Sequence, residues 1–167
     1  MNNDGLRLHN VSKRFGDKQA LTEVSIDVAP GEVLALTGPS GAGKTTLCNC
    51  ITGLEAPDHG SIRLNGDDLI SQAPGARRAA FLFESYALYP HRSVFENAAS
   101  PLQVPNREPN LTAAELKDRV EQQLETLAIG HLAHRLPSEL SGGQKQRAAL
   151  ARALVQHEAK ITLLDEP

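Results

Sequence analysis

GPSGAGKT, residues 38–45, is the stretch of this sequence that decides the fold. It fits the phosphate-binding pattern G-x-x-x-x-G-K-[ST], in which glycines let backbone N–H groups approach phosphate oxygens. The mostly apolar run Glu32 to Thr37 precedes it, as expected of a strand buried on both faces. A helix is expected to follow from about Lys44 to Gly53, where glycine supplies a left-handed cap. A strand, a glycine-rich loop and a helix in this order predict a phosphate-binding loop rather than a chance glycine-rich turn.

Different parts of this loop are expected to contact the phosphates and the metal ion. The helix N-terminus adds partial positive charge, Lys44 reaches the β- and γ-phosphates, and the Thr45 hydroxyl can bind Mg²⁺. ATP and Mg²⁺ are therefore the expected cofactors. The residues expected to bind the nucleotide here are Gly38, Pro39, Ser40, Gly41, Ala42, Gly43, Lys44, Thr45 and Thr46.

The closing stretch ITLLDEP delivers two acids to the end of an apolar run. A P-loop ATPase needs an acid that holds Mg²⁺ at the tip of a neighbouring parallel strand, and Asp165 is placed for this task. Glu166 can then polarise the attacking water. A strand that ends in acids is weak evidence by itself, but together with the P-loop it predicts ATP hydrolysis.

A third motif, LSGGQ, consists of Leu140, Ser141, Gly142, Gly143 and Gln144. It puts a serine and two glycines at a predicted helix start, which is a second anion-binding terminus in the same chain. The alternative is a flexible loop with a glycine-rich cap. The order of the P-loop, this motif and the two acids favours the anion-binding interpretation.

The remaining pattern predicts a sheet first and helices later. Alternating residues in Leu6 to Val11 and Leu21 to Val28 indicate an antiparallel β-layer, to which a hairpin turning at Asn65-Gly66 is added. Ala79 to Phe83 is a further candidate buried strand.

The middle of the chain carries signals for two helices. Ser93 with Glu96, and Thr112 with Glu115, have capping-box spacing, and Gly130 is expected to end the second helix. An apolar stripe on the second helix consists of Leu116, Val120, Leu124 and Leu127.

Composition limits the class of protein. A chain of 167 residues suits one domain, and a net charge of −3 gives no broad surface for nucleic acid. No apolar run is long enough to cross a bilayer and no secretory signal precedes the first strand, so a cytosolic protein is expected. Cys48 and Cys50 are expected to be buried thiols in a reduced compartment.

The sequence resembles the ATP-binding cassette family, the nucleotide-binding subunits of ABC transporters. The similarity runs from the N-terminal strands through GPSGAGKTT, SYALYPH and LSGGQKQR to LLDEP. It implies an α/β fold with an N-terminal antiparallel β-subdomain, a parallel core sheet and a helical subdomain. The expected division is 1–90 for the β-subdomain and P-loop core, 91–140 for the helical subdomain, and 141–167 for the signature helix and last strand.

The resemblance also implies partners and site residues. Two cassettes pair head to tail, so Ser141, Gly142 and Gly143 would serve a nucleotide held by a partner cassette. Phe15 falls where the family places an aromatic ring that stacks on adenine, although it could instead fill an edge of the core. Membrane permease subunits would hold the protein at the inner face of the cell membrane, and an extracytoplasmic solute-binding protein would take part indirectly.

The stretch SYALYPHRSVFENAASPL most resembles the sequences of ATPase subunits from importers of carbohydrates and sugar phosphates such as glycerol 3-phosphate. In such systems the loop Tyr86 to His91 lies near the docking site for the permease. Packing of this loop under the helical subdomain is the alternative for its individual residues.

The chain departs from the family at two places. Glu84 stands where the family has a glutamine that reaches toward Mg²⁺ and the attacking water; glutamate keeps an oxygen ligand but adds negative charge and removes the amide donor. The family also continues past the acids, so the resemblance implies a fragment without its C-terminal part, which by itself would lack efficient turnover.

Two competing functions stay open at this stage. The chain could be a non-catalytic fragment that binds nucleotide or associates with complete cassettes or permease. It could also belong to a soluble ABC ATPase of DNA repair or translation, although the mild acidity and the importer-like wording count against that class.

Overall fold

The computed structural model describes residues 5–104, 111–156 and 158–165. The chain forms two compact units, Met1–Ala79 and Ala80–Pro167. The three-part division expected from the sequence remains a prediction.

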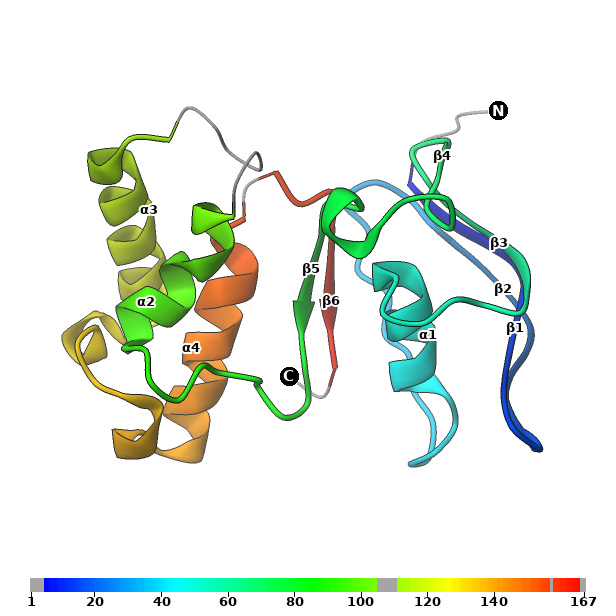
Figure 1. Ribbon diagram of the computed structural model, residues 1–167, viewed down its shortest axis with the longest axis horizontal. Helices are drawn as coiled ribbons and strands as arrows, with labels where there is room; N and C mark the ends of the chain where they lie inside the picture. The colour runs from blue at the N-terminus through cyan, green and yellow to red at the C-terminus, as the bar shows by residue number, and fades with distance from the viewer. Residues whose placement is uncertain (1–4, 105–110, 157, 166–167) are drawn as a thin grey trace. The chain divides into compact units, whose positions relative to one another are not determined.

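The first unit contains a four-stranded antiparallel sheet (Figure 1). Its order is β2-β1-β3-β4. The strands are β1 (Leu6–Phe15), β2 (Lys18–Val28), β3 (His59–Leu64) and β4 (Asp67–Asp68). Alternation buries Leu6 and Leu8 of β1, and Ile62 of β3 lies opposite Leu8. The predicted antiparallel β-layer is confirmed, with strands that extend beyond the expected ranges.

The hairpin between β3 and β4 turns at Asn65 and Gly66, as predicted. Their φ angles of 52° and 87° are both positive. A two-residue turn of this kind matches the right-handed twist of the flanking strands, and asparagine and glycine adopt it at little cost.

Helix α1 (Lys44–Thr52) follows the glycine-rich loop. Gly53 ends the helix with a φ of 85°, and its N–H donates to the Asn49 oxygen at 2.9 Å, so the predicted cap is confirmed. Leu47 and Ile51 are buried, and so are Cys48 and Cys50, which are not joined by a disulfide. Burial raises the pKa of the Cys50 thiol.

The strand expected over Glu32 to Thr37 is wrong. This segment has no regular secondary structure and is exposed along its whole length; Val33 is 95% exposed. An apolar run becomes a strand only where another strand pairs with its backbone. In the part of the chain that the structure describes, the two sheets consist of β1 to β4 and of β5 with β6, so neither includes this segment.

The second unit contains a two-stranded sheet of β5 (Ala79–Leu82) and β6 (Ile161–Leu164). Figure 1 shows both arrows pointing the same way, so the pair is parallel. The Asp165 N–H continues the pairing by donating to the Leu82 oxygen at 3.0 Å. The strands predicted around Ala79 and at ITLL are therefore confirmed, but β6 is only half-buried, with Leu164 exposed.

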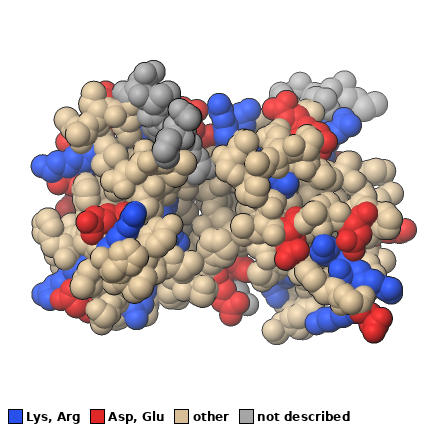
Figure 2. Space-filling model, in the orientation of Figure 1, with Lys and Arg blue, Asp and Glu red and all other residues tan. Residues whose placement is uncertain are grey.

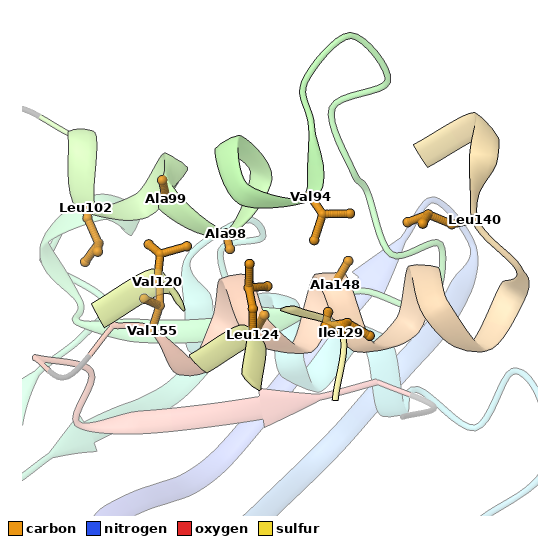
Figure 3. Close-up of a cluster of buried hydrophobic side chains, with 11 residues drawn as sticks. Val94, Ala98, Ala99, Leu102, Val120, Leu124, Ile129, Leu140, Ala148 and Val155 are labelled. Atoms are coloured by element: carbon orange, nitrogen blue, oxygen red, sulfur yellow. The ribbon is translucent and has the colours of Figure 1, made fainter. Parts of the chain in front are cut away.

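Helices α2 (Val94–Ala99), α3 (Ala113–Thr126) and α4 (Gly142–Leu154) enclose the main hydrophobic cluster of this unit (Figure 3). Val120 and Leu124 of α3 are fully buried in it, and Leu116 and Leu127 pack against it, so the predicted apolar stripe is confirmed. The short 3₁₀ segments are η1 (Pro74–Ala76), η2 (Ser100–Gln103), η3 (Gly130–Leu132) and η4 (Pro137–Glu139).

Both predicted capping boxes are present. Ser93 and Thr112 accept from the backbone N–H groups of Glu96 and Glu115, whose carboxylates accept in return. The expected end of the second helix at Gly130 is wrong. Helix α3 ends at Thr126, Ala128 takes the left-handed conformation with φ 55°, and Gly130 begins η3. A glycine permits a left-handed cap, but a nearby alanine takes it here at a steric cost.

Charges of both signs are interspersed on the face shown in Figure 2. This agrees with the small net charge of the chain. Among the described residues, no helix is long and apolar enough to cross a membrane.

Candidate nucleotide-binding site

The phosphate loop lies between β2 and α1 in the first unit. Lys44 is the first residue of α1, and its ammonium donates to the Gly38 oxygen at 2.9 Å and to the Pro39 oxygen at 3.1 Å. The side chain therefore folds back over the loop and encloses it. An ammonium in this position can exchange carbonyl partners for phosphate oxygens without moving its backbone.

Gly43 is the N-cap of α1, and its backbone lies very close to the backbone of β2. Its φ is 92°, and a Cβ added to it would lie 2.5 Å from the Ala20 oxygen. Any larger residue would meet both backbone strain and a collision with backbone. The sequence places glycine here because the helix N-terminus must start directly beside the sheet.

Phe15 is the last residue of β1, and its ring is 45% exposed. The ring is thus not an edge of the core, which was the alternative to base stacking. The Lys13 ammonium lies 5.2 Å from the ring centroid. An exposed aromatic ring of this kind can stack on a base.

The second unit carries the acids and the loop that follows β5. Asp165 comes directly after β6 and is only 6% exposed, whereas Glu84 lies in an exposed turn after β5. Glu166 lies outside the described residues. The structure brings Asp165 and Leu82 together by a backbone hydrogen bond, so Asp165 and the end of β5 share one edge of this sheet.

The candidate ligands of Mg²⁺ are oxygen atoms, on Thr45, Asp165 and Glu84. Mg²⁺ prefers oxygen ligands and is usually held by one or two carboxylates together with substrate phosphates, rather than by an all-protein cage. Within the described residues, no group of three or more acids, histidines or cysteines could hold a metal ion by itself. Oxygen donors of this kind suit Mg²⁺ that enters with a nucleotide.

The motif LSGGQ lies at the start of α4. Ser141 is the N-cap and accepts from the Gln144 N–H at 3.4 Å, while the Gln144 side chain accepts from the Ser141 N–H at 2.8 Å. Gly142 and Gly143 are exposed, and a Cβ at either would meet nothing within 4 Å. Leu140 is buried in the helical cluster. The exposed part of the motif is therefore a capped helix N-terminus that begins at Ser141.

Two arginines that bind main-chain oxygens, Arg77 and the half-buried Arg152, were not found from the sequence. Arg77 is 5% exposed and donates through Nη1 to the Cys50 oxygen at 2.8 Å and the Ile51 oxygen at 3.0 Å, so a cation caps the C-terminus of α1. Arg152 of α4 donates to the main-chain oxygens of Tyr86 and Ala87. Burial lowers the pKa of both guanidinium groups. The only sequence signal for Arg152 is its place within the apolar run AALARAL. Its partners could not be found from the sequence, because they lie 65 and 66 residues earlier in the chain.

The family model described as "ABC transporter" matches residues 21–167. The chain belongs to the ABC transporter family. Among curated relatives, it is 49% identical to the sulfate/thiosulfate import ATP-binding protein CysA of Vibrio cholerae, over 97% of this chain and 43% of that protein. It is 47% identical to CysA of Rhodopseudomonas palustris, over 97% of this chain and 46% of that protein. The chain thus spans less than half the length of these relatives.

Two solved structures share the fold of this ABC cassette. The dimeric structure of MJ0796, a bacterial ABC transporter cassette, has a TM-score of 0.84 at 24% identity, covering 97% of this chain and 88% of that chain. MJ0796 in a post-hydrolysis state with ADP and Pi has a TM-score of 0.82 at 25% identity, covering 95% and 86%. The predicted cassette fold is confirmed. The predicted likeness to sugar-phosphate importers is not supported, because the relatives above are sulfate/thiosulfate import proteins.

Proposed function

We propose that this chain is the ATP-binding part of an ABC importer subunit, and that the whole protein hydrolyses ATP to drive import. The observation that carries the proposal is the closed phosphate loop, in which Lys44 folds over the Gly38 and Pro39 oxygens at the start of α1. Backbone N–H groups at this helix start and the lysine ammonium would bind the phosphates of ATP, and the exposed Phe15 ring would stack on adenine.

The acids of the second unit would supply the hydrolytic chemistry. Asp165 and Thr45 would hold Mg²⁺, with Glu84 as a further oxygen ligand, and Glu166 would orient and polarise the attacking water. When bound, Mg²⁺ neutralises negative charge on the phosphates. Lys44 would stabilise the charge that develops as the terminal phosphoryl group is transferred.

The signature would act on a second nucleotide. Ser141, Gly142 and Gly143 form an exposed, capped helix start, which suits an anion supplied from outside this chain. A second cassette is the proposed source, and the dimeric structure of MJ0796, which shares this fold, supports the arrangement. Leu140 would anchor the motif to the helical cluster, and Gln144 would keep it capped.

Sulfate or thiosulfate is the proposed solute class, in place of the sugar phosphate first expected. The names of the relatives at 47–49% identity support it. Permease subunits would select and conduct the solute and hold the cassette at the inner membrane face, with a solute-binding protein acting indirectly. A cell that lacks this gene should lose uptake of radiolabelled sulfate and keep uptake of glycerol 3-phosphate; the reverse result would restore the sugar-phosphate assignment.

Calorimetric titration of the full chain with MgATP tests nucleotide binding. Replacing Lys44→Ala should weaken binding by at least about tenfold, because it removes a charge-assisted contact with phosphate. Lys117→Ala, at an exposed position of α3, is the matched control and should bind as the parent does. Equal affinities for the parent and the Lys44 variant would contradict the proposal.

A further inference from the structure

Lys13 lies at the centre of a charged cluster that the candidate site does not use. Its ammonium donates to the Ala56 oxygen at 2.7 Å and lies 3.7 Å from a Glu55 carboxylate oxygen and 3.5 Å from an Asp58 carboxylate oxygen. The side chain is only 13% exposed. All three partners belong to the segment that follows the C-terminal cap of α1 at Gly53.

The same segment after α1 is hydrogen-bonded to β1 at the residues on both sides of Lys13. The Asp58 N–H donates to the Ser12 oxygen at 2.8 Å, and the Asp58 carboxylate accepts from the Arg14 N–H at 2.7 Å. The ladder between β1 and β2 is irregular here, with register shifts between Val11 and Lys13 and between Lys13 and Arg14. The end of β1 is therefore held from two sides, by shifted pairing with β2 and by the segment after α1.

The ring of Phe15 depends on this arrangement. Lys13 and Phe15 are two residues apart on β1, and their side chains are in contact. The Lys13 ammonium lies 5.2 Å from the ring centroid, within the range of a cation–π contact. Because Phe15 is 45% exposed, the contact with this cation is a restraint on the orientation of its ring.

We propose that Lys13 is a positioning residue for the base subsite, which orients the Phe15 ring for stacking on adenine. The inference rests on the proposed function, in which Phe15 stacks on adenine and the loop at the start of α1 binds the phosphates. Lys13 ties the ring to the segment after α1, so one helix sets the position of both subsites. If Lys13 only stabilised the fold, its replacement would weaken binding of the base and binding of the phosphates to the same extent.

The sequence contains no tryptophan, so Phe15→Trp would place a unique fluorophore at this position. The full chain carrying Phe15→Trp would be titrated with MgATP and, separately, with magnesium tripolyphosphate, which lacks the base. Lys13→Gln should weaken MgATP binding about fivefold, while tripolyphosphate affinity stays within about twofold of the parent. Lys13→Arg, which keeps the charge, should restore MgATP affinity, and Lys117→Gln is the charge-matched control.

Fluorescence anisotropy without nucleotide gives a second readout, which needs no ligand. Lys13→Gln should lower the anisotropy of Trp at position 15 because the ring loses its cation, with circular dichroism of the variant unchanged. Equal losses for MgATP and tripolyphosphate, unchanged MgATP affinity, or unchanged anisotropy would overturn the inference. A parent chain that binds neither ligand would instead overturn the proposed function, and the positioning role in base stacking with it.

Discussion

The guanidinium of Arg152 in α4 donates a hydrogen bond of 2.7 Å to the main-chain oxygen of Tyr86. A second one, of 2.6 Å, goes to the oxygen of Ala87. Tyr86 and Ala87 have φ angles of 60° and 44°, a conformation that costs energy for residues with a Cβ. One arginine thus holds a strained pair of residues in the loop after Glu84 and ties that loop to the helix that begins at the signature.

Replacing Arg152→Gln should lower the free energy of unfolding by about 2 kcal/mol, because charge-assisted hydrogen bonds to the strained loop are lost. Urea denaturation followed by circular dichroism measures the change. Arg147→Gln, at an exposed position of the same helix, is the control and should change stability by less than about 0.5 kcal/mol. Equal effects of the two substitutions would show that the contacts with Tyr86 and Ala87 do not stabilise the fold.

Gly43→Ala should destabilise the first unit by about 2 kcal/mol or more, since the added Cβ meets the Ala20 oxygen and the φ of 92° is unfavourable for alanine. Thermal unfolding of the full chain measures the effect as a lowered Tm. Gly75→Ala is the control, because a Cβ there meets nothing within 4 Å. A Tm for Gly43→Ala equal to that of the control would mean that β2 can move away from the loop.

Leu124→Ala should lower the free energy of unfolding by about 2–5 kcal/mol, because Leu124 is fully buried in the cluster of α2, α3 and α4 and its truncation leaves a cavity. Leu154→Ala removes the same atoms from a side chain that is 38% exposed and should cost clearly less. Urea denaturation compares the two variants. Equal losses would contradict the packing shown in Figure 3.

Several of the correct predictions rest on signals within a few residues of one another. The capping boxes at Ser93 and Thr112, the turn at Asn65-Gly66 and the cap at Gly53 depend on side chains and φ angles inside one short segment. The helix after the P-loop could be predicted for the same reason. These features need no distant partner.

Features that depend on distant residues could not be predicted in this way. The run Glu32 to Thr37 has the composition of a strand, but a strand also needs a neighbour, which composition does not specify. The partners of Arg152 lie 65 and 66 residues earlier in the chain. In the candidate site, the loop residues followed from the motif alone, whereas the cation beside Phe15 became visible only in three dimensions.

The capping box of α3 predicts a stability that depends on pH. Hydrogen bonds from the Thr112 hydroxyl and then from its backbone N–H hold the pKa of Glu115 below its usual range. The folded state therefore favours the carboxylate, and the added stability is present above the pKa of the unfolded chain, about 4.3, and is lost as pH falls through the lower folded pKa. The stability difference between the parent and Glu115→Gln, measured by urea denaturation, should shrink on acidification.

Glu121→Gln, in the middle of the same helix, is the control for this experiment. Its difference from the parent should change less over the same acid range. A difference between the parent and Glu115→Gln that stays constant from about pH 7 to about pH 3 would contradict the role of the carboxylate in the cap.

Glu84→Gln should tighten MgATP binding by about threefold at low salt, because it removes a negative charge that, in the proposed role of Glu84, would repel the phosphates, and it supplies an amide donor. Glu84 is exposed in its turn, so added salt should reduce the gain. Calorimetric titrations at two ionic strengths measure both effects, with Glu121→Gln as a control for loss of one acidic charge. In the whole protein, hydrolysis rate and Mg²⁺ dependence would be measured for the same substitution. Values equal to the parent in every measurement would mean that Glu84 has no special role and that the carboxylate is tolerated in place of the amide.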